Sequence, residues 1–474
     1  MPEMPWFEIF VASYLVWVLL ACASLLMSRR SPQATLAWMF AFIALPVVSG
    51  FYYMVFGPRR LMRRKRRYGL ARAEAGRVSQ YLRSTACPKQ PSLGRDAAGL
   101  AAVGRRLGQG TPTFAEAVTL LDTAQEKMDA LADSLAAAKH HVHLEYYIWE
   151  PDDVGVRFRD LLVEARKRGV EVRVLVDGVG SSQAKPKFWR PLVDAGGEVL
   201  VFNPVEIRTG RLHFANFRTH RKIAIIDGHT GYLGGINIHV NANEWRDEHA
   251  RIVGEPVRKL QRLFLEQWTY SGGAFSLDGT SIAPYFPPAT GNGEGVPTQI
   301  LASGPDDDTA PLLAFYLAAI ATARHRIWIE TPYLIPDESL EAALRVAVLR
   351  DVEVHVIVPK EGDSRLVTAA SHTYCDSLGR AGIQIFEYGP PMLHAKTLLV
   401  DDTMGIVGTA NVDNRSFRLN FEVAAAFYDR GVIEHLSKRF EADRAFSKPF
   451  PHKRRGPRMT QMLESIARLT SPVL

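Results

Sequence analysis

Two long apolar runs open the chain, and no later run is as long. Residues 9–27 are almost wholly apolar, and after Arg29, Arg30 and Pro32 a second run extends from residue 34 to around Phe56. About 20 apolar residues are enough for a helix to cross a bilayer. The pattern therefore predicts two transmembrane helices within residues 1–58, joined as a hairpin.

A cleaved signal peptide is the alternative for the first run. The sequence Leu19, Leu20, Ala21, Cys22 loosely resembles a lipoprotein cleavage site. However, a signal peptide begins with basic residues, whereas this chain has Glu3 and Glu8 and no lysine or arginine before residue 29. The hairpin is therefore the preferred interpretation.

From about residue 113 onward, β-branched runs alternate with helical patterns. The runs 172–176 and 354–358 read as buried strands, and 161–168 and 340–349 have the spacing of amphipathic helices. Such alternation is typical of an α/β fold whose sheets are parallel or mixed. We expect a mixed β-sheet flanked by helices.

The order of these elements occurs twice. In the first half, HVHLEYYIW (141–149) is followed by a helical stretch, two strands and THRKIAIID (219–227). In the second half, HRIWIETPYLI (325–335) begins the same succession, which ends at LHAKTLLVD (393–401). A repeat of this kind predicts two similar lobes, each a mixed β-sheet flanked by helices. The expected segments are the two transmembrane helices 1–58, a basic juxtamembrane connector 59–112, a first lobe 113–270, a linker 271–296, a second lobe 297–450 and a basic amphipathic C-terminal segment 451–474.

Charge changes the picture by its placement. The net charge is +7, and basic residues cluster at 59–67 and again at 453–458. Such clusters suit an anionic surface, either a membrane or a nucleic acid, and the two apolar runs favour the membrane. Because the cluster at 59–67 outweighs Arg29 and Arg30, the positive-inside rule places both termini and everything after residue 57 in the cytoplasm.

The cysteines carry no metal or disulfide pattern. Cys22, Cys87 and Cys375 are odd in number and widely spaced, with no CxxC. We therefore expect no structural zinc site and no disulfide framework.

The candidate chemistry lies in the two copies of HxKxxxxD. Side chains two apart in a strand share a face, so His220 projects with Lys222, and His394 with Lys396. The closing aspartates have the opposite parity and precede turn-like dipeptides, so we expect them to anchor the motif. These aspartates are Asp227 and Asp401.

A second pattern follows each motif at equal spacing from its histidine. It reads Gly-Gly-Ile-Asn, ending at Asn237, in one copy and Gly-Thr-Ala-Asn, ending at Asn411, in the other. Small residues let a ligand approach the backbone, and an asparagine amide adds a neutral donor. We expect both asparagines to bind substrate.

If the two lobes face each other, these side chains suit a phosphodiester. Lysines and amides would stabilise the charged oxygens of a phosphoryl transition state, one histidine would attack phosphorus, and the other would protonate the departing alkoxide. Each histidine needs an orienting partner, for which Asp247 and Glu422 are the candidates, with Glu248 a competitor of Asp247.

These motifs resemble those of the phospholipase D superfamily. Further stretches, EYYIW, WRDEH, TPYLIPD, EGDSRLV, NVDNRSFRLNFE and the ending RLTSPVL, make nearly the whole chain similar to the bacterial cardiolipin synthases. The resemblance implies transfer of a phosphatidyl group from one phosphatidylglycerol to another, giving cardiolipin and glycerol without a metal or organic cofactor. It also implies that the two histidines, lysines and aspartates of the motifs are active-site residues. By analogy with relatives, His220 would be the nucleophile and His394 the acid.

Three alternatives stay open at this point. A hydrolytic phospholipase D would use the same residues with water as acceptor, and a different synthase would take phosphatidylethanolamine as donor. A nuclease of the same superfamily would fit the basic clusters but not the apolar runs, so no nucleic-acid partner is expected. A lipid-binding scaffold without activity would show one degraded motif, and both are intact.

Overall fold

The computed structural model describes residues 6–27, 32–45, 48–50, 53, 69, 89–204, 217–275, 282–288, 293–307 and 309–451, with scattered residues between 462 and 471. Several expected features lie outside the described residues. They are the basic clusters at 59–67 and 453–458, part of the second apolar run and part of the linker. The chain divides into two compact units, and the described residues up to 69 belong to the first.

Two apolar helices make up the described part of this first unit, α1 (Trp6–Leu26) and α2 (Pro32–Ala44). Buried Ala21, Leu25 and Phe42 pack together between them. Of the helices in the described part of the chain, only α1 is long and apolar enough to cross a membrane, with 21 residues and a mean hydropathy of 2.4. One such helix is compatible with membrane association.

The second spanning helix of the expected hairpin is not confirmed. Helix α2 has 13 residues, well short of the roughly 20 that a bilayer requires. It ends directly before Leu45 and Pro46, because a residue that precedes proline is disfavoured in the α conformation.

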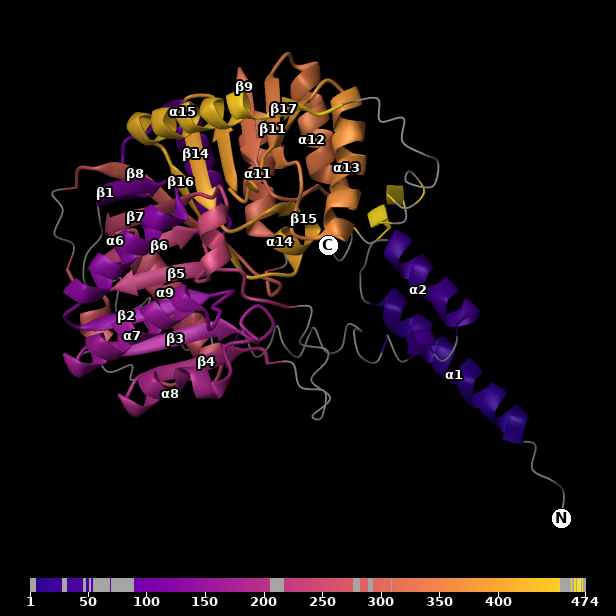
Figure 1. Cartoon of the computed structure of the whole chain (residues 1–474). Coiled ribbons are helices and arrows are strands. Elements are labelled where there is room, and N and C mark those ends of the chain that lie inside the picture. The colour runs from indigo at the N-terminus through magenta and orange to yellow at the C-terminus, as the bar shows by residue number, and fades with distance from the viewer. Residues whose placement is uncertain are drawn as a thin grey trace. The chain divides into compact units, whose positions relative to one another are not determined.

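One sheet of fifteen strands dominates the second unit (Figure 1). We call the strands β1 to β7 the first half of the sheet and those from β8 onward the second half. The first half comprises β1 (Thr113–Leu121), β2 (His141–Tyr146), β3 (Glu171–Asp177), β4 (Glu198–Phe202), β5 (Lys222–Ile226), β6 (Thr230–Gly234) and β7 (His249–Gly254). The second half comprises β8 (Val296–Ser303), β9 (Arg326–Glu330), β11 (Glu353–Pro359), β12 (Gln384–Tyr388), β13 (Thr397–Val400), β14 (Met404–Gly408), β16 (Glu422–Phe427) and β17 (Lys448–Pro449). A separate ribbon pairs β10 (Leu334–Ile335) with β15 (Val412–Asp413).

The strand order is the same in both halves. The second half has one additional edge strand, β17, which pairs antiparallel with β12. Without it, the order from the outside inward is β4, β3, β2, β5, β6, β7, β1 in the first half and β12, β11, β9, β13, β14, β16, β8 in the second. In each half the three outer strands are parallel and the remaining pairs antiparallel. The sheet is mixed, as the sequence predicted.

The sequence predicted one sheet for each lobe, whereas the structure joins both halves into one. Strands β1 and β8 pair antiparallel through Thr113 with Thr298, Phe114 with Pro297 and Ala115 with Val296. An unpaired edge strand exposes its backbone N–H and C=O groups, so pairing two inner edges satisfies both. The join uses few residues, which is why the hydrophobic pattern carried no sign of it.

Helices cover the sheet, and each half has its own apolar core. The helices are α5 (Arg95–Arg106), α6 (Ala124–Ala137), α7 (Asp153–Lys167), α8 (Pro186–Asp194), α9 (Val257–Tyr270), α11 (Pro311–Thr322), α12 (Glu338–Leu349), α13 (Arg365–Arg380), α14 (Asn414–Arg418) and α15 (Arg430–Phe446), with 3-10 turns η2 (Val240–Glu244) and η3 (Ala283–Tyr285). Polar caps fix several starts: Asp152 accepts from the N–H of Gly155, and Asp337 from that of Leu340. These rigid elements hold the ends of β5 and β13, where the motifs lie.

Candidate active site

Each motif histidine is attached by its backbone to a segment from the other half of the sheet. The N–H of His220, just before β5, donates to the carbonyl of Phe421 at 2.9 Å, next to β16. The N–H of His394, in the segment before β13, donates to the carbonyl of Arg246 at 2.7 Å, before β7. Equivalent backbone hydrogen bonds therefore tie each motif to the opposite half of the sheet.

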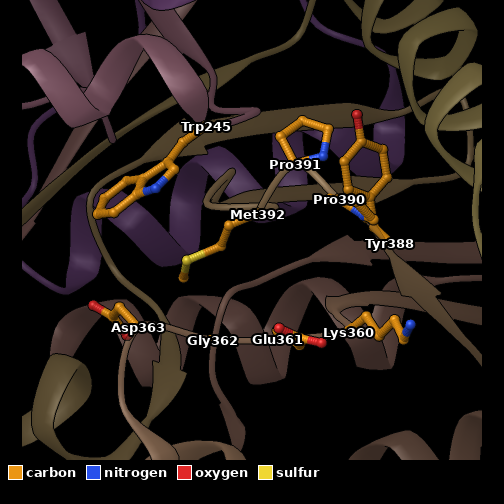
Figure 2. A pocket seen from close by; sticks show the side chains of 10 residues that line it. Trp245, Lys360, Glu361, Gly362, Asp363, Tyr388, Pro390, Pro391 and Met392 are labelled. Atoms are coloured by element: carbon orange, nitrogen blue, oxygen red, sulfur yellow. The ribbon is translucent and has the colours of Figure 1, made fainter.

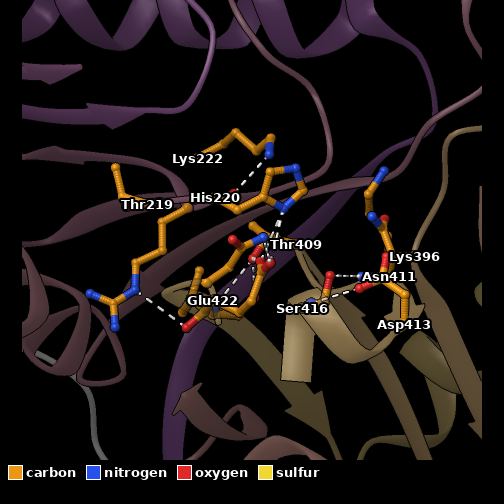
Figure 3. A network of polar contacts seen from close by, with 12 residues as sticks. Thr219, His220, Lys222, Lys396, Thr409, Asn411, Asp413, Ser416 and Glu422 are labelled. Atoms are coloured by element: carbon orange, nitrogen blue, oxygen red, sulfur yellow. Dashed lines mark hydrogen bonds and ion pairs between the residues drawn. The ribbon is translucent and has the colours of Figure 1, made fainter. Parts of the chain in front are cut away.

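The side chain of His220 is oriented by Glu422, the first residue of β16 (Figure 3). The ring Nδ1 lies 3.1 Å from Oε1 of Glu422, whose side chain is fully buried. The carboxylate also accepts hydrogen bonds from Thr409 and Asn420. Burial raises the pKa of Glu422, but His220, Lys222 and the hydroxyl of Thr409 outweigh it and hold the pKa below its ordinary value. Glu422 is therefore an anion.

His394 is oriented in the same way by Asp247. Its Nδ1 lies 2.6 Å from Oδ2 of the aspartate, and both side chains are buried. Glu248, the competing candidate, forms an ion pair with Arg246 at 3.0 Å instead. The carboxylate partners are thus crossed, because each histidine receives its partner from the opposite half of the sheet.

The two motif lysines are buried beside their histidines. Lys222 donates from Nζ to the carbonyl of His220 at 2.7 Å, and Lys396 places Nζ 2.8 Å from Nδ1 of His394. Burial lowers the pKa of Lys222 to about 7 and that of Lys396 to about 8, although Glu422 and Asp247 oppose the effect. The lysines are poised to gain charge stabilisation from an anion.

Both histidines lose basicity for the same reason. Burial lowers the pKa of His220, and Lys222 and Lys396 add to the effect. Burial and Lys396 lower the pKa of His394 to about 4, despite Asp247. Within the described part of the chain, no group hydrogen-bonds Nε2 of either ring, so both Nε2 atoms can meet a ligand. A bound phosphodiester would supply the negative charge that this cluster lacks.

The motif aspartates lie at the turns where their strands end. Asp227 accepts backbone hydrogen bonds from Lys139, His140 and His141 through its two carboxylate oxygens. Asp401 accepts in the same way from residues 324, 325 and 326. Their φ angles are 54° and 50°, in the left-handed region. Each aspartate thus ties the end of its motif strand to the start of a neighbouring strand.

Replacing Asp401 by alanine is expected to lower the free energy of unfolding by about 2 kcal/mol, since three backbone N–H groups, one of them half-buried, lose hydrogen bonds to a charged acceptor. Thermal unfolding in detergent measures the loss. The control is Asp402→Ala on the same turn, where the aspartate is 86% exposed. Equal stability of the two variants would contradict the anchoring role.

The two asparagines lie close to the motifs but differ in their contacts. Asn237 accepts a hydrogen bond at Oδ1 from the N–H of Ile148 at 3.1 Å. The backbone N–H of Asn411 donates to the hydroxyl of Ser416 at 3.1 Å (Figure 3). Both are buried. Asn237 thereby holds the segment that carries Tyr147.

Sequence reasoning missed the aromatic partner of His394. The ring of Tyr147 lies 4.9 Å from that of His220. The ring of Trp245 lies 4.9 Å from that of His394. The neighbouring aromatic side chains Tyr146 and Trp149 belong instead to the buried core. Nothing in the local sequence distinguishes the aromatic residues beside the histidines from those in the core. However, Trp245 stands directly before Arg246, whose carbonyl accepts the hydrogen bond from the N–H of His394.

Comparisons with known proteins agree with this geometry. Residues 131–268 and 316–444 match the family described as "Cardiolipin synthase, PLD-like domain". The chain is 35% identical over 471 residues to cardiolipin synthase 1 of Bacillus anthracis, covering 94% of this chain and 90% of that protein. It is also 35% identical over 477 residues to the major cardiolipin synthase ClsA of Bacillus subtilis, covering 97% and 98%.

A solved structure supports the fold alone. The crystal structure of phosphatidylserine synthase from Haemophilus influenzae superposes with a TM-score of 0.60 at 15% identity, covering 79% of this chain and 100% of that one. The family match and the sequence relatives, which align over almost the full length of this chain, confirm the resemblance drawn from the paired motifs. The chain belongs to the cardiolipin synthase family of phospholipase D-like phosphatidyltransferases.

Proposed function

We propose that this enzyme transfers the phosphatidyl group of one phosphatidylglycerol to the glycerol hydroxyl of a second, releasing glycerol and forming cardiolipin. The observation that carries the proposal is the crossed arrangement of two histidines and two carboxylates around two buried lysines. Such a centre offers a nucleophile, an acid and two cations to a phosphodiester.

In the first step, Nε2 of His220 attacks phosphorus. Glu422 at Nδ1 holds the ring proton there and stabilises the imidazolium that forms, which leaves Nε2 as the nucleophile. The phosphorus to glycerol bond breaks, and His394 gives its Nε2 proton to the departing oxygen. The product is a phosphohistidine that carries the phosphatidyl group.

In the second step, the glycerol hydroxyl of another phosphatidylglycerol attacks the phosphohistidine. His394 takes the hydroxyl proton, the bond between phosphorus and Nε2 of His220 breaks, and cardiolipin leaves. Lys222 and Lys396 stabilise the phosphoryl oxygens in both steps, with Asn237 and Asn411 proposed as further donors. The substrate phosphate offsets the repulsion that lowers the pKa of His394, so its proton is available when the lipid is bound.

We further propose that two N-terminal helices within 1–58 anchor the enzyme to the cell membrane, with the catalytic lobes on the cytoplasmic side. The apolar helix α1 and the basic clusters of the sequence support this placement. An anchored enzyme meets its lipid substrate at a high local concentration. The two-lobe division, with lobes at 113–270 and 297–450, rests on the repeated strand order.

Incubating the purified protein with phosphatidylglycerol vesicles tests the reaction. Cardiolipin and glycerol are expected in equal amounts, and EDTA is expected to leave the rate unchanged. Lipid products are separated by thin-layer chromatography, and the amount of cardiolipin is compared with the amount of glycerol released. Phosphatidic acid as the main product would show that water is the acceptor. In a second incubation, phosphatidylethanolamine labelled in its phosphate is added to the vesicles, and labelled cardiolipin would show that this lipid is also a donor.

A further inference from the structure

A pocket of about 380 Å³ opens among loops of the second half of the sheet. Figure 2 shows the side chains that line it. Two loops of the second half, 360–363 and 388–392, enclose it together with the side chain of Trp245 from the first half. Its lining residues are Trp245, Lys360, Glu361, Gly362, Asp363, Tyr388, Gly389, Pro390, Pro391 and Met392. The volume lies near the lower end of the range for small-molecule sites.

Two contacts place this pocket next to the reacting centre. The ring of Trp245, which forms one wall, lies 4.9 Å from the ring of His394. Met392, at the middle of the pocket, stands two residues before His394 in the chain. Its carbonyl accepts a hydrogen bond from the backbone N–H of Arg246 at 2.9 Å. A group bound in the pocket therefore lies on the side of the site that His394 serves.

The polar groups of the pocket are mainly acceptors. Asp363 accepts a hydrogen bond from the hydroxyl of Tyr333 at 2.6 Å, which fixes one of its oxygens and leaves the other for a ligand. The negative charge of Asp363 raises the pKa of Lys396, although burial lowers that pKa by more. Glu361 and Lys360 continue this wall away from Trp245 (Figure 2).

This combination selects a neutral polyol. Two carboxylates against one lysine disfavour a phosphate, which the buried Lys222 and Lys396 attract instead. Carboxylate oxygens accept hydrogen bonds from hydroxyl groups, and the carbon faces of Trp245 and Met392 suit the C–H groups of a polyol. The phosphate and the headgroup of one lipid would thus bind at separate places.

We infer that this pocket holds the glycerol headgroup of phosphatidylglycerol, first as the leaving group and then as the attacking alcohol. The inference rests on the proposed function. The second step reverses the bond changes of the first, so the departing and the attacking oxygen occupy the same position beside the same acid and base. Because the pocket adjoins His394, that histidine is the general acid and base, and His220 is the nucleophile.

The test is a competition between two alcohols. Cardiolipin vesicles are incubated with radiolabelled glycerol and methanol together, and the ratio of labelled phosphatidylglycerol to phosphatidylmethanol is measured. The label is needed because attack of methanol on cardiolipin also releases phosphatidylglycerol, which is then unlabelled. Methanol lacks the diol that Asp363 and Glu361 would bind. Asp363→Asn is expected to lower the ratio about tenfold, the size of one hydrogen bond to a charged group, and Glu361→Gln is expected to lower it in the same direction.

The control is Glu434→Gln on α15, an exposed carboxylate of the same half that pairs with Lys438 and should leave the ratio unchanged. Thermal unfolding of each variant shows whether it is folded. An unchanged ratio in both folded pocket variants would overturn the inference. If the unmodified enzyme makes neither phosphatidylglycerol in this assay nor cardiolipin from phosphatidylglycerol, the proposed function fails instead.

Discussion

Exchanging His220 for asparagine is expected to reduce cardiolipin formation by at least about 10⁴-fold, since no covalent intermediate can form without the nucleophile. Exchanging His394 for asparagine is expected to reduce it about 10²- to 10⁴-fold, the usual contribution of a general acid and base. Both substitutions keep a polar, uncharged side chain next to the buried carboxylates Glu422 and Asp247.

The two variants are distinguished with a donor whose leaving group needs no proton, such as a phosphatidyl nitrophenol. The His394 variant should still release nitrophenol in a burst and accumulate the phosphohistidine, because the acid is dispensable for this donor. The His220 variant should give neither. The reverse outcome would exchange the two roles, and full activity of either variant with phosphatidylglycerol would remove the two-histidine mechanism.

Replacing Lys222 by methionine is expected to abolish most activity and yet stabilise the fold. The activity should fall about 10²- to 10³-fold, since one cation on the phosphoryl oxygens is lost. The pKa of Lys222 in the folded protein, about 7, lies below its ordinary 10.5 because the side chain is buried. The unfolded chain therefore binds this proton more tightly, which opposes folding.

The sign of the pH dependence follows from this difference. Above pH 10.5 both states have lost the proton, so Lys222 imposes no proton-linked cost on folding. The cost grows as the pH falls from 10.5 to about 7 and is then constant. At pH 7 the methionine variant should gain on the order of a few kcal/mol in unfolding free energy, and near pH 10 very little. Thermal unfolding at the two pH values measures the gain.

Lys127→Met provides the matched control for this experiment. Lys127 is fully buried, with Nζ 4.8 Å from the centre of the Tyr146 ring, and burial holds its pKa well below the ordinary value. Its replacement should also stabilise the fold at pH 7, but cardiolipin formation should change only a few-fold. If Lys222→Met kept more than about a tenth of the activity, the lysine would not act on the phosphate.

The sequence predicted the mixed sheet, the repeated elements and the residues of both motifs, because all of these depend on local spacing. The periodicity of strands put each lysine with its histidine, and the turn after each motif marked the anchoring aspartate. The sequence could not decide between Asp247 and Glu248. That choice depends on which of the two carboxylates contacts the ring of His394, and the contact joins segments far apart in the chain.

Long-range pairing accounts for the remaining differences. The join between β1 and β8 depends on three residue pairs far apart in the chain, and no periodicity reports it. The pocket beside His394 is formed by Trp245 from one half and the loops 360–363 and 388–392 from the other. The short helix α2 differs from the prediction for a local reason. The apolar run predicted one long helix, because the hydrophobic pattern does not register that a single proline can end it.

The crossed carboxylates have a consequence for the order in which the enzyme becomes active during its synthesis. A nascent chain that already contains His220 still lacks Glu422, and His394 finds Asp247 only after its own segment has emerged and docked. A truncated chain that ends before Glu422 therefore holds a His220 without its orienting carboxylate. The site is complete only when strands from both halves are present and paired.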